Sequence, residues 1–214
     1  MSNEELQGWA QGGSNYPIDI VFDIDCTGSM HDCIANTKEM AKNFGDDFLK
    51  KMKELGKSCS KENTRVRVIG FRDETMGEKM QISPFYRMSD QEDEFKQFVD
   101  GLVAQGGGPE PESSYEAIIE ACNSDWVKDG AKRRQVIVVF TDASAHREKF
   151  ADLIGAWDGM DPNFKRLVLF APDHPTWTDF IGQAANVTHY QSKAGMGLEE
   201  HDKDAIMAAI AGSI

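Results

Sequence analysis

The sequence predicts an α/β protein with a doubly wound, mostly parallel central sheet of about six strands and helices on both faces. Two observations support this fold class. Short β-branched apolar runs alternate with longer amphipathic stretches from residue 18 to the end of the chain. The most apolar run, 136–141 (VIVVFT), has no polar face, as expected for a central strand buried between two helix layers.

The expected strands coincide with the apolar runs. The weakest is 81–86, which we place at a sheet edge because Pro84 lies inside it and cannot donate a ladder hydrogen bond. In chain order, strands are predicted at 18–24, 64–71, 81–86, 136–141, 166–171 and 187–190.

The expected helices coincide with stretches in which apolar residues return every three or four positions. Gly56 is expected to end the first helix, and Pro111 to occupy the first turn of the third. In chain order, helices are predicted at 29–55, 90–103, 111–122, 148–157, 176–185 and 202–211.

Length and charge limit the class of protein. The 214 residues suit a single domain, which we place at 16–214 after a flexible, polar and glycine-rich segment 1–15. The net charge is −13, from 36 acidic and 23 basic residues, and no Lys/Arg cluster stands out. Binding to nucleic acid or to an anionic membrane is therefore not expected.

Several absences favour a cytoplasmic protein. The N-terminal residues lack the pattern of a secretory signal, and no apolar run approaches the ~18 residues of a membrane span. The four cysteines form no CxxC pair, so a zinc site is not predicted and we expect reduced thiols. They are Cys26, Cys33, Cys59 and Cys122.

Three segments place polar groups after expected strands or before a helix, where ligands of open parallel sheets bind. They are 23–30 (DIDCTGSM), 106–112 (GGGPEPE) and 141–146 (TDASAH). A carboxylate followed by two hydroxyls offers the hard oxygen ligands that Mg²⁺ or Mn²⁺ prefers. Each segment alone also fits a simpler interpretation, such as a helix cap or a turn, and His146 is more typical of a loop or cap than of a ligand.

Together the three segments resemble the von Willebrand factor type A (vWA) family. Asp25-x-Thr27-x-Ser29-Met30 is similar to its DxSxS signature, GGGPEPE to its glycine loop, and residues 138–146 to a later strand end, all in the family's order. The resemblance covers about residues 17–213. It implies a Rossmann-like fold with a metal-ion-dependent adhesion site (MIDAS).

The resemblance also implies a set of metal ligands. Thr27 and Ser29 would bind Mg²⁺ (or Mn²⁺ or Ca²⁺) through their hydroxyls, and Asp25 and Asp142 would bind it directly or through water. The family's remaining ligand, a Thr or Asp in the glycine loop, is replaced here by Pro109, which has no side-chain oxygen. Glu110 or Glu112 is then the candidate substitute.

The function implied by the resemblance is an intracellular, metal-dependent adaptor that is not an enzyme. A partner protein would supply an acidic side chain to complete the coordination of the metal. Asp23 departs from the family's usual apolar residue, and a carboxylate buried in a strand needs a partner. Arg72, after the second strand, is the candidate partner.

An enzyme remains the alternative. Asp23-Ile24-Asp25-Cys26-Thr27 also matches DxDxT, the nucleophile motif of haloacid-dehalogenase-type phosphatases, in which the first Asp attacks phosphorus with the help of Mg²⁺. That interpretation accounts for Asp23. It leaves the glycine loop unexplained, and it lacks a well-placed basic residue and the later pair of acids.

Overall fold

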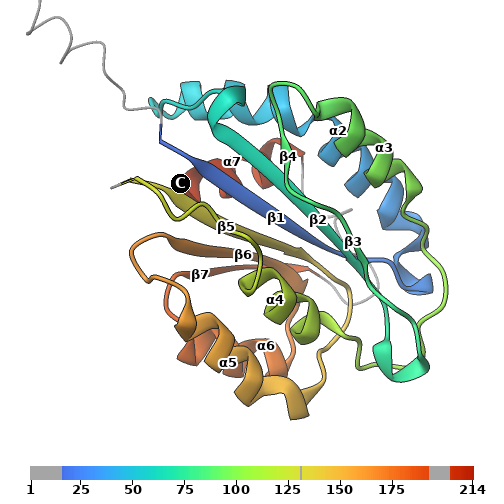
Figure 1. The fold of residues 1–214 in the computed structure, drawn as a ribbon. Coiled ribbons are helices and arrows are strands. Elements are labelled where there is room, and N and C mark those ends of the chain that lie inside the picture. The colour runs from blue at the N-terminus through green and yellow to red at the C-terminus, as the bar shows by residue number, and fades with distance from the viewer. Residues whose placement is uncertain (1–15, 131, 193–202) are drawn as a thin grey trace, which may run out of the picture.

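The computed structural model describes residues 16–130, 132–192 and 203–214. They form one sheet with helices on both faces (Figure 1). The predicted flexible segment 1–15, and hence the domain boundary at residue 16, lies outside the described residues. None of the helices in the described ranges is both long enough and apolar enough to cross a membrane.

The sheet confirms the predicted fold class. Its order is β3-β2-β1-β5-β6-β7, and β4 also pairs with β2. The pairs β2–β1, β1–β5, β5–β6 and β6–β7 are parallel, whereas β3 and β4 run antiparallel to β2. The strands are β1 (Ile18–Asp25), β2 (Thr64–Phe71), β3 (Gln81–Ile82), β4 (Tyr86–Arg87), β5 (Arg134–Phe140), β6 (Lys165–Pro172) and β7 (Val187–Ser192).

The edge segment differs from the prediction. Residues 81–86 were expected as one strand, but the structure has two short strands that flank Pro84. Ser83 lies between them, and its hydroxyl accepts a hydrogen bond from the amide of Val68 at 2.9 Å. A side chain thus takes the place of one main-chain acceptor in the ladder.

Two helix layers cover the sheet. On one face the even-numbered residues of β1 pack with α2 (His31–Glu54), α3 (Glu92–Gly101) and α7 (Lys203–Ser213). On the other face Val21 packs with α4 (Ser114–Cys122), α5 (Phe150–Gly159) and α6 (Pro175–Gln183). This alternation follows from the period-two geometry of a strand.

One predicted helix start was wrong. Pro111 was expected in the first turn of α4, but the helix begins at Ser114. The intervening Glu112 forms an isolated parallel bridge with Ala145. Those residues therefore belong to the loop that joins α3 to α4, residues 102–113, which we call the glycine loop.

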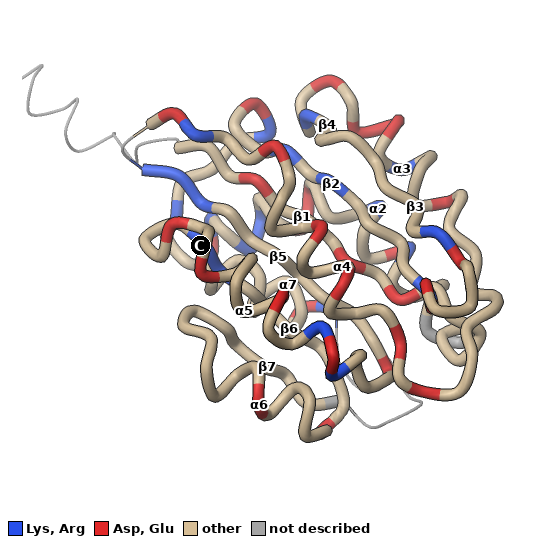
Figure 2. Tube along the Cα trace, turned by 60° about the horizontal axis from the view of Figure 1, so that its bottom comes forward, with Lys and Arg blue, Asp and Glu red and all other residues tan. Residues whose placement is uncertain are grey.

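Acidic positions are spread over the whole chain trace (Figure 2). Some lie at the carboxyl end of the sheet, where Asp25 is the last residue of β1 and Asp142 lies two residues beyond the end of β5. These two strands are adjacent and parallel, so the two acids are brought to the same edge.

Candidate metal centre

Asp25, the last residue of β1, is the centre of the site. Its side chain is fully buried. Its Oδ1 accepts hydrogen bonds from the amide of Thr27 at 2.9 Å and from the Thr27 hydroxyl at 2.6 Å. Its Oδ2 accepts one from the hydroxyl of Thr141, the residue that follows β5, at 2.7 Å. The carboxylate therefore connects the ends of two adjacent strands.

A chain of oxygen atoms continues from Asp25 towards solvent. The hydroxyls of Thr27 and Ser29 lie 3.0 Å apart, and the Ser29 hydroxyl donates to Oδ1 of Asp142 at 3.1 Å. Thr27 is buried, whereas Ser29 is exposed. The structure thus brings together the four residues Asp25, Thr27, Ser29 and Asp142 that the sequence predicts as ligands, with the open side at Ser29.

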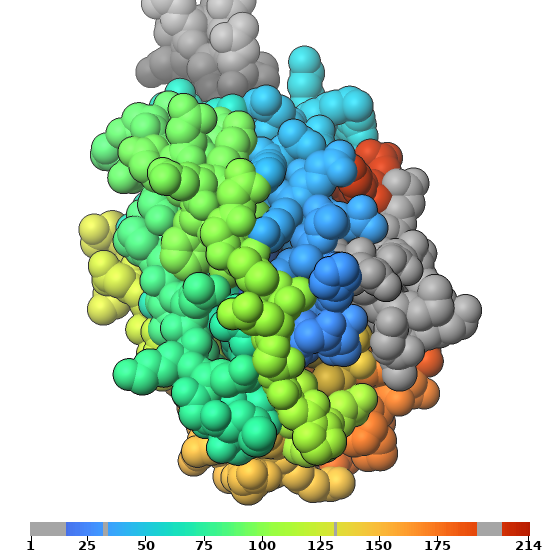
Figure 3. Space-filling view, turned by 90° about the vertical axis from the view of Figure 1, so that its right-hand side faces the viewer, coloured from blue at the N-terminus to red at the C-terminus, as the bar shows by residue number. Residues whose placement is uncertain are grey.

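Main-chain hydrogen bonds fix the glycine loop against this cluster. The amide of Gly28 donates to the carbonyl of Gly106 at 3.0 Å, and the amide of Gln105 donates to the carbonyl of Cys26 at 3.0 Å. At the other end of the loop, the amide of Glu112 donates to the carbonyl of Ser144 at 2.9 Å. Figure 3 shows this loop running between the 72–80 segment and the residues that follow β1.

Gly107 is required at its place in the loop. Its φ of +75° is a left-handed conformation that favours glycine. A Cβ atom there would lie 3.0 Å from Cβ of Thr27 and 3.0 Å from Oε1 of Glu112. Glu112 and Thr27 therefore both approach the space that a side chain at position 107 would occupy.

The two candidate substitutes for the missing loop ligand have different surroundings. Glu110 is exposed, and its Oε2 accepts hydrogen bonds from the amide and the hydroxyl of Ser144 at 3.1 and 2.8 Å. Glu112 is buried, and its Oε2 has no hydrogen-bond partner. Pro109 is exposed. Glu112 thus holds a buried oxygen without a partner, whereas Glu110 ties the loop to the segment after β5.

The carboxyl groups of the cluster bind protons unusually tightly. Burial raises the pKa of Glu112 to about 8, and the charges of Asp25, Asp73, Glu78 and Asp142 add to this rise. Burial also raises the pKa of Asp25 to about 6, against the hydrogen bonds from Thr27 and Thr141. The pKa of Asp142 is raised by burial as well.

The donor set fits a hard divalent cation. Oδ2 of Asp142 and Oε2 of Glu112 are both buried without a partner, and buried charges of one sign are normally paired or bound to a metal. Within the described ranges, no group of three or more His, Cys, Asp and Glu side chains is arranged to hold a metal on its own. A cation here would therefore depend on the hydroxyls of Thr27 and Ser29, as oxygen-binding Mg²⁺ permits.

The structure also contains a network that the sequence did not indicate. His146 is buried, and its Nδ1 lies 2.9 Å from Oε1 of Glu116 on α4. Its Nε2 lies 3.7 Å from Oδ1 of Asp73, which caps the short helix η3 (Glu74–Met76). His146 therefore links three segments around the site.

The predicted pairing of Asp23 with Arg72 is wrong. Arg72 donates to the carbonyls of Cys26 and Val103 at 3.0 and 2.7 Å. Asp23 is fully buried, and neither carboxyl oxygen has a hydrogen-bond partner. Burial raises the pKa of Asp23 well above its usual range, although the charge of Arg67 opposes the shift.

The position of Asp23 bears on the phosphatase alternative. Asp23 lies two residues before the end of β1, on the face covered by α4, and is closed off from solvent. A nucleophile must reach its substrate within hydrogen-bond distance. Asp23 has no such access in this structure.

Comparison with known proteins agrees with the fold. The family model described as "von Willebrand factor A domain" matches residues 19–157. The chain belongs to this family. No curated protein matches the sequence.

Solved structures with the vWA fold resemble the chain over most of its length. The pilus adhesin SpaC from Lactobacillus rhamnosus GG, in an open conformation, has a TM-score of 0.57 at 13% identity, over 93% of this chain and 30% of the adhesin. Proximal thread matrix protein 1 of the mussel byssus, solved with a zinc-occupied MIDAS motif, has a TM-score of 0.59 at 14% identity, over 93% of this chain and 46% of that protein. The chain thus spans less than half of either protein.

Proposed function

We propose that this vWA domain is a protein-interaction module that binds an acidic side chain of a partner protein through a divalent cation, with Mg²⁺ as the first candidate. Asp25, Thr27, Ser29 and Asp142 would hold the cation, and Glu112 would take the role that Pro109 cannot fill. The observation that carries the proposal is the continuous set of oxygen atoms from Asp25 to Asp142. Glu112 lies near enough for the charges of Asp25 and Asp142 to raise its pKa, and its Oε2 has no partner.

The chain's own residues prepare the site in three ways. Thr141 fixes one oxygen of Asp25, so that the other faces Thr27. The main-chain bonds of the glycine loop fix the backbone of Glu112 to Ser144 and the backbone of Gly106 to Gly28. The exposed Ser29 leaves the solvent side open for an incoming carboxylate. A bound dication would supply the positive charge that attracts this carboxylate.

Glu110 is not a ligand under this proposal. Its carboxylate is engaged by Ser144, so recruiting it would break two hydrogen bonds. A cytoplasmic setting remains part of the proposal, and Cys26, Cys59 and Cys122 are free thiols in the structure. The zinc-occupied site of the mussel protein supports a metal at this position in the fold.

The first test is calorimetric titration of chelator-stripped protein with Mg²⁺ and Mn²⁺. Saturable binding is expected for the wild type and should be lost in Ser29→Ala, because the exposed hydroxyl is a direct ligand. Ser89→Ala, which removes an exposed hydroxyl before α3, is the matched control and should bind like the wild type.

A second measurement tests the open coordination position. Water-proton relaxation of the Mn²⁺-loaded protein reports water bound to the metal, and acetate should reduce the signal by displacing that water. Normal metal binding without any effect of acetate would contradict the role of a partner carboxylate. Equal metal binding by the wild type and Ser29→Ala would refute the metal site itself.

A further inference from the structure

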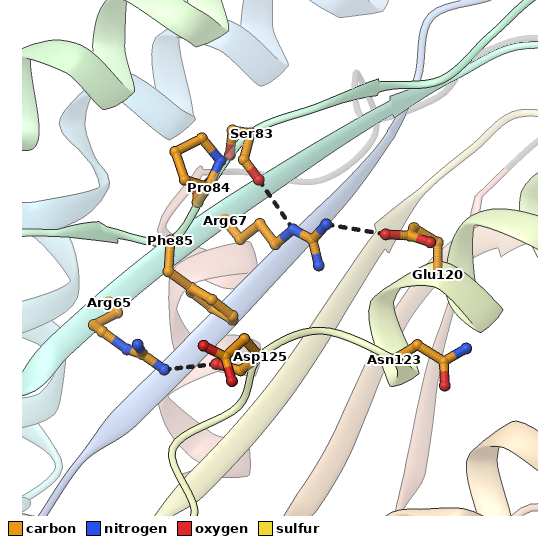
Figure 4. A pocket seen from close by; sticks show the side chains of 8 residues that line it. All are labelled: Arg65, Arg67, Ser83, Pro84, Phe85, Glu120, Asn123 and Asp125. Atoms are coloured by element: carbon orange, nitrogen blue, oxygen red, sulfur yellow. Dashed lines mark hydrogen bonds and ion pairs between the residues drawn. The ribbon is translucent and has the colours of Figure 1, made fainter.

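A trough lies beside the metal centre, between α4 and the 79–85 segment at the sheet edge. One hollow of 460 Å³ is lined by residues that include Glu74, Met80, Ile82, Ile119 and Glu120. A second hollow of 480 Å³ is lined by Arg65, Arg67, Phe85, Glu120 and Asn123 among others (Figure 4). Because Glu120 lines both, the hollows adjoin; we call them together the α4 trough.

The trough begins at the metal centre. The amide of Glu74, at its near end, donates to the hydroxyl of Ser113 at 2.9 Å, and Ser113 follows Glu112 directly. Met76, in the same short helix, has side-chain atoms 3.6–3.7 Å from the position of a Cβ atom at Gly108. A protein that reaches the metal from the solvent side therefore also meets this end of the trough.

Exposed apolar side chains occur at the same place. Met76 is 62% exposed and Ile82 is 41% exposed, although both are large and apolar. Single exposed apolar residues are common and need no explanation. Here, however, one contacts the glycine loop and the other lines the hollow, and apolar surface beside a concave site is typical of interaction surfaces.

The charges around the near hollow are mostly negative. Glu74, Glu116 and Glu120 line it, against the single cation Lys79. Glu116 contacts His146, and Glu120 pairs with Arg67 at 3.0 Å. No ion pair is found for Glu74 among the described residues, and its side chain is exposed.

The arginines of the far hollow are already engaged within the fold. Arg65 binds both oxygens of Asp19 at 2.8 and 2.7 Å. Arg67 donates to the Ser83 carbonyl, the Ser124 hydroxyl and Glu120. Figure 4 shows Phe85 between the two arginines. The trough thus offers an incoming chain apolar side chains along its length and unpaired negative charge at its near end.

We propose that the α4 trough binds a basic, apolar segment of the same partner whose carboxylate reaches the metal. The inference rests on the proposed function, and it adds the chemistry of the partner: an acidic residue followed by a stretch that carries Lys or Arg together with large apolar residues. Ile82 and Met80 contact the apolar residues of that segment, and Glu74 pairs with its basic residue.

Selection of random peptides displayed on phage against the full chain in Mg²⁺ tests this inference. Enriched peptides should combine Asp or Glu with Lys or Arg and large apolar residues. The selected peptides are then synthesised and their affinities measured for Ile82→Glu and Glu74→Lys. Each variant has a control with a similar change away from the trough. Leu55→Glu, directly after α2, matches Ile82→Glu, and Leu55 is 47% exposed. Asp47→Lys, at an exposed position on α2, matches Glu74→Lys.

Both trough variants should weaken binding by about tenfold or more, while the controls stay within about twofold of the wild type. Unchanged affinity in the trough variants, a selection without basic and apolar enrichment, or no binders at all would overturn the inference. The chelator EDTA separates the two proposals. Binding that EDTA abolishes but the trough variants leave unchanged upholds the metal-dependent function alone. Binding that the trough variants weaken but EDTA leaves unchanged contradicts the metal-dependent function.

Discussion

Replacing Asp23 with Asn should stabilise the domain, and by more at higher pH. Asp23 is fully buried between β1 and α4, and neither oxygen has a partner. Burial raises the pKa of Asp23 well above the ordinary value of 3.8. The charge of Arg67 opposes this rise, and the charge of Glu120 adds to it. The folded protein therefore holds a proton here that the unfolded chain releases above that value.

The sign and size of the effect follow from proton linkage. Where the folded state binds one more proton than the unfolded state, the free energy of unfolding falls by about 1.4 kcal/mol per pH unit. This loss begins near the ordinary pKa and continues up to the raised one. The asparagine of the Asp23→Asn variant has nearly the same shape and does not titrate, so the variant avoids the loss. As long as the pH lies between these two pKa values, the advantage of the variant over the wild type should grow by about 1.4 kcal/mol per pH unit.

Urea unfolding followed by circular dichroism, in EDTA at several pH values, measures this difference. The other carboxyl groups with raised pKa values, Asp25, Glu112 and Asp142, are common to both proteins and cancel in the comparison. Asp93→Asn, at an exposed position on α3, is the control and should follow the wild type at every pH. A difference between Asp23→Asn and the wild type that does not change with pH would show that Asp23 is ionised in the folded state, and would refute the reasoning.

Three further predictions concern the metal centre and its frame. Gly107→Ala should cost about 1–3 kcal/mol of stability and weaken Mg²⁺ binding, because position 107 has a positive φ and a Cβ atom there would make short contacts. Urea unfolding measures the stability and calorimetry measures the Mg²⁺ affinity. An unchanged Mg²⁺ affinity would contradict the prediction. Mg²⁺ affinity should rise between about pH 6 and 8 as Glu112 and Asp25 lose their protons. Calorimetry in buffers of different ionisation enthalpy detects the release of these protons on Mg²⁺ binding. An Mg²⁺ affinity that does not change with pH would argue against both residues as ligands. Pro109→Asp should raise Mg²⁺ affinity by restoring an oxygen at the family's ligand position, and calorimetry showing no gain would mean that this position does not face the metal.

The oxygen cluster of Asp25, Thr27, Ser29 and Asp142 could be predicted because its residues end or follow strands in a fixed order. Asp25 ends β1, and Thr141 and Asp142 directly follow β5. The adjacency of these two parallel strands brings the acids together. The order of the three motifs, through the family resemblance, suggested this arrangement. The arrangement itself depends on the pairing of β1 with β5, which are far apart in the sequence, so local sequence patterns do not determine it.

Alternation along the strands could have excluded the pairing of Asp23 with Arg72. Asp23 has the parity of Val21, which faces α4. Arg72 continues the parity of Val68, which faces the α2 layer, and it reaches the carbonyl of Val103 in the glycine loop. Asp23 and Arg72 were paired because each lies near the carboxyl end of a strand. Their side chains, however, lie on opposite faces of the sheet.

The start of α4 could not be predicted from local sequence alone. Pro at the first turn of a helix is a sound local signal, but Glu112 forms its main-chain bond with Ser144 on another strand end. That contact holds the chain extended until Ser113, whose amide bonds the carbonyl of Arg72. Tertiary contacts thus delay the helix by three residues relative to the prediction.

The attachment of the glycine loop through main-chain atoms has an evolutionary consequence. Amide-to-carbonyl bonds join Gly28 to Gly106 and Glu112 to Ser144 whatever side chains the exposed loop positions carry. Residues such as Pro109 and Met76 can therefore change without dismantling the frame that holds the oxygen cluster. Under the proposed function, a lineage of such domains can acquire new partners by exchanging these rim residues one at a time, while each intermediate keeps the folded oxygen cluster.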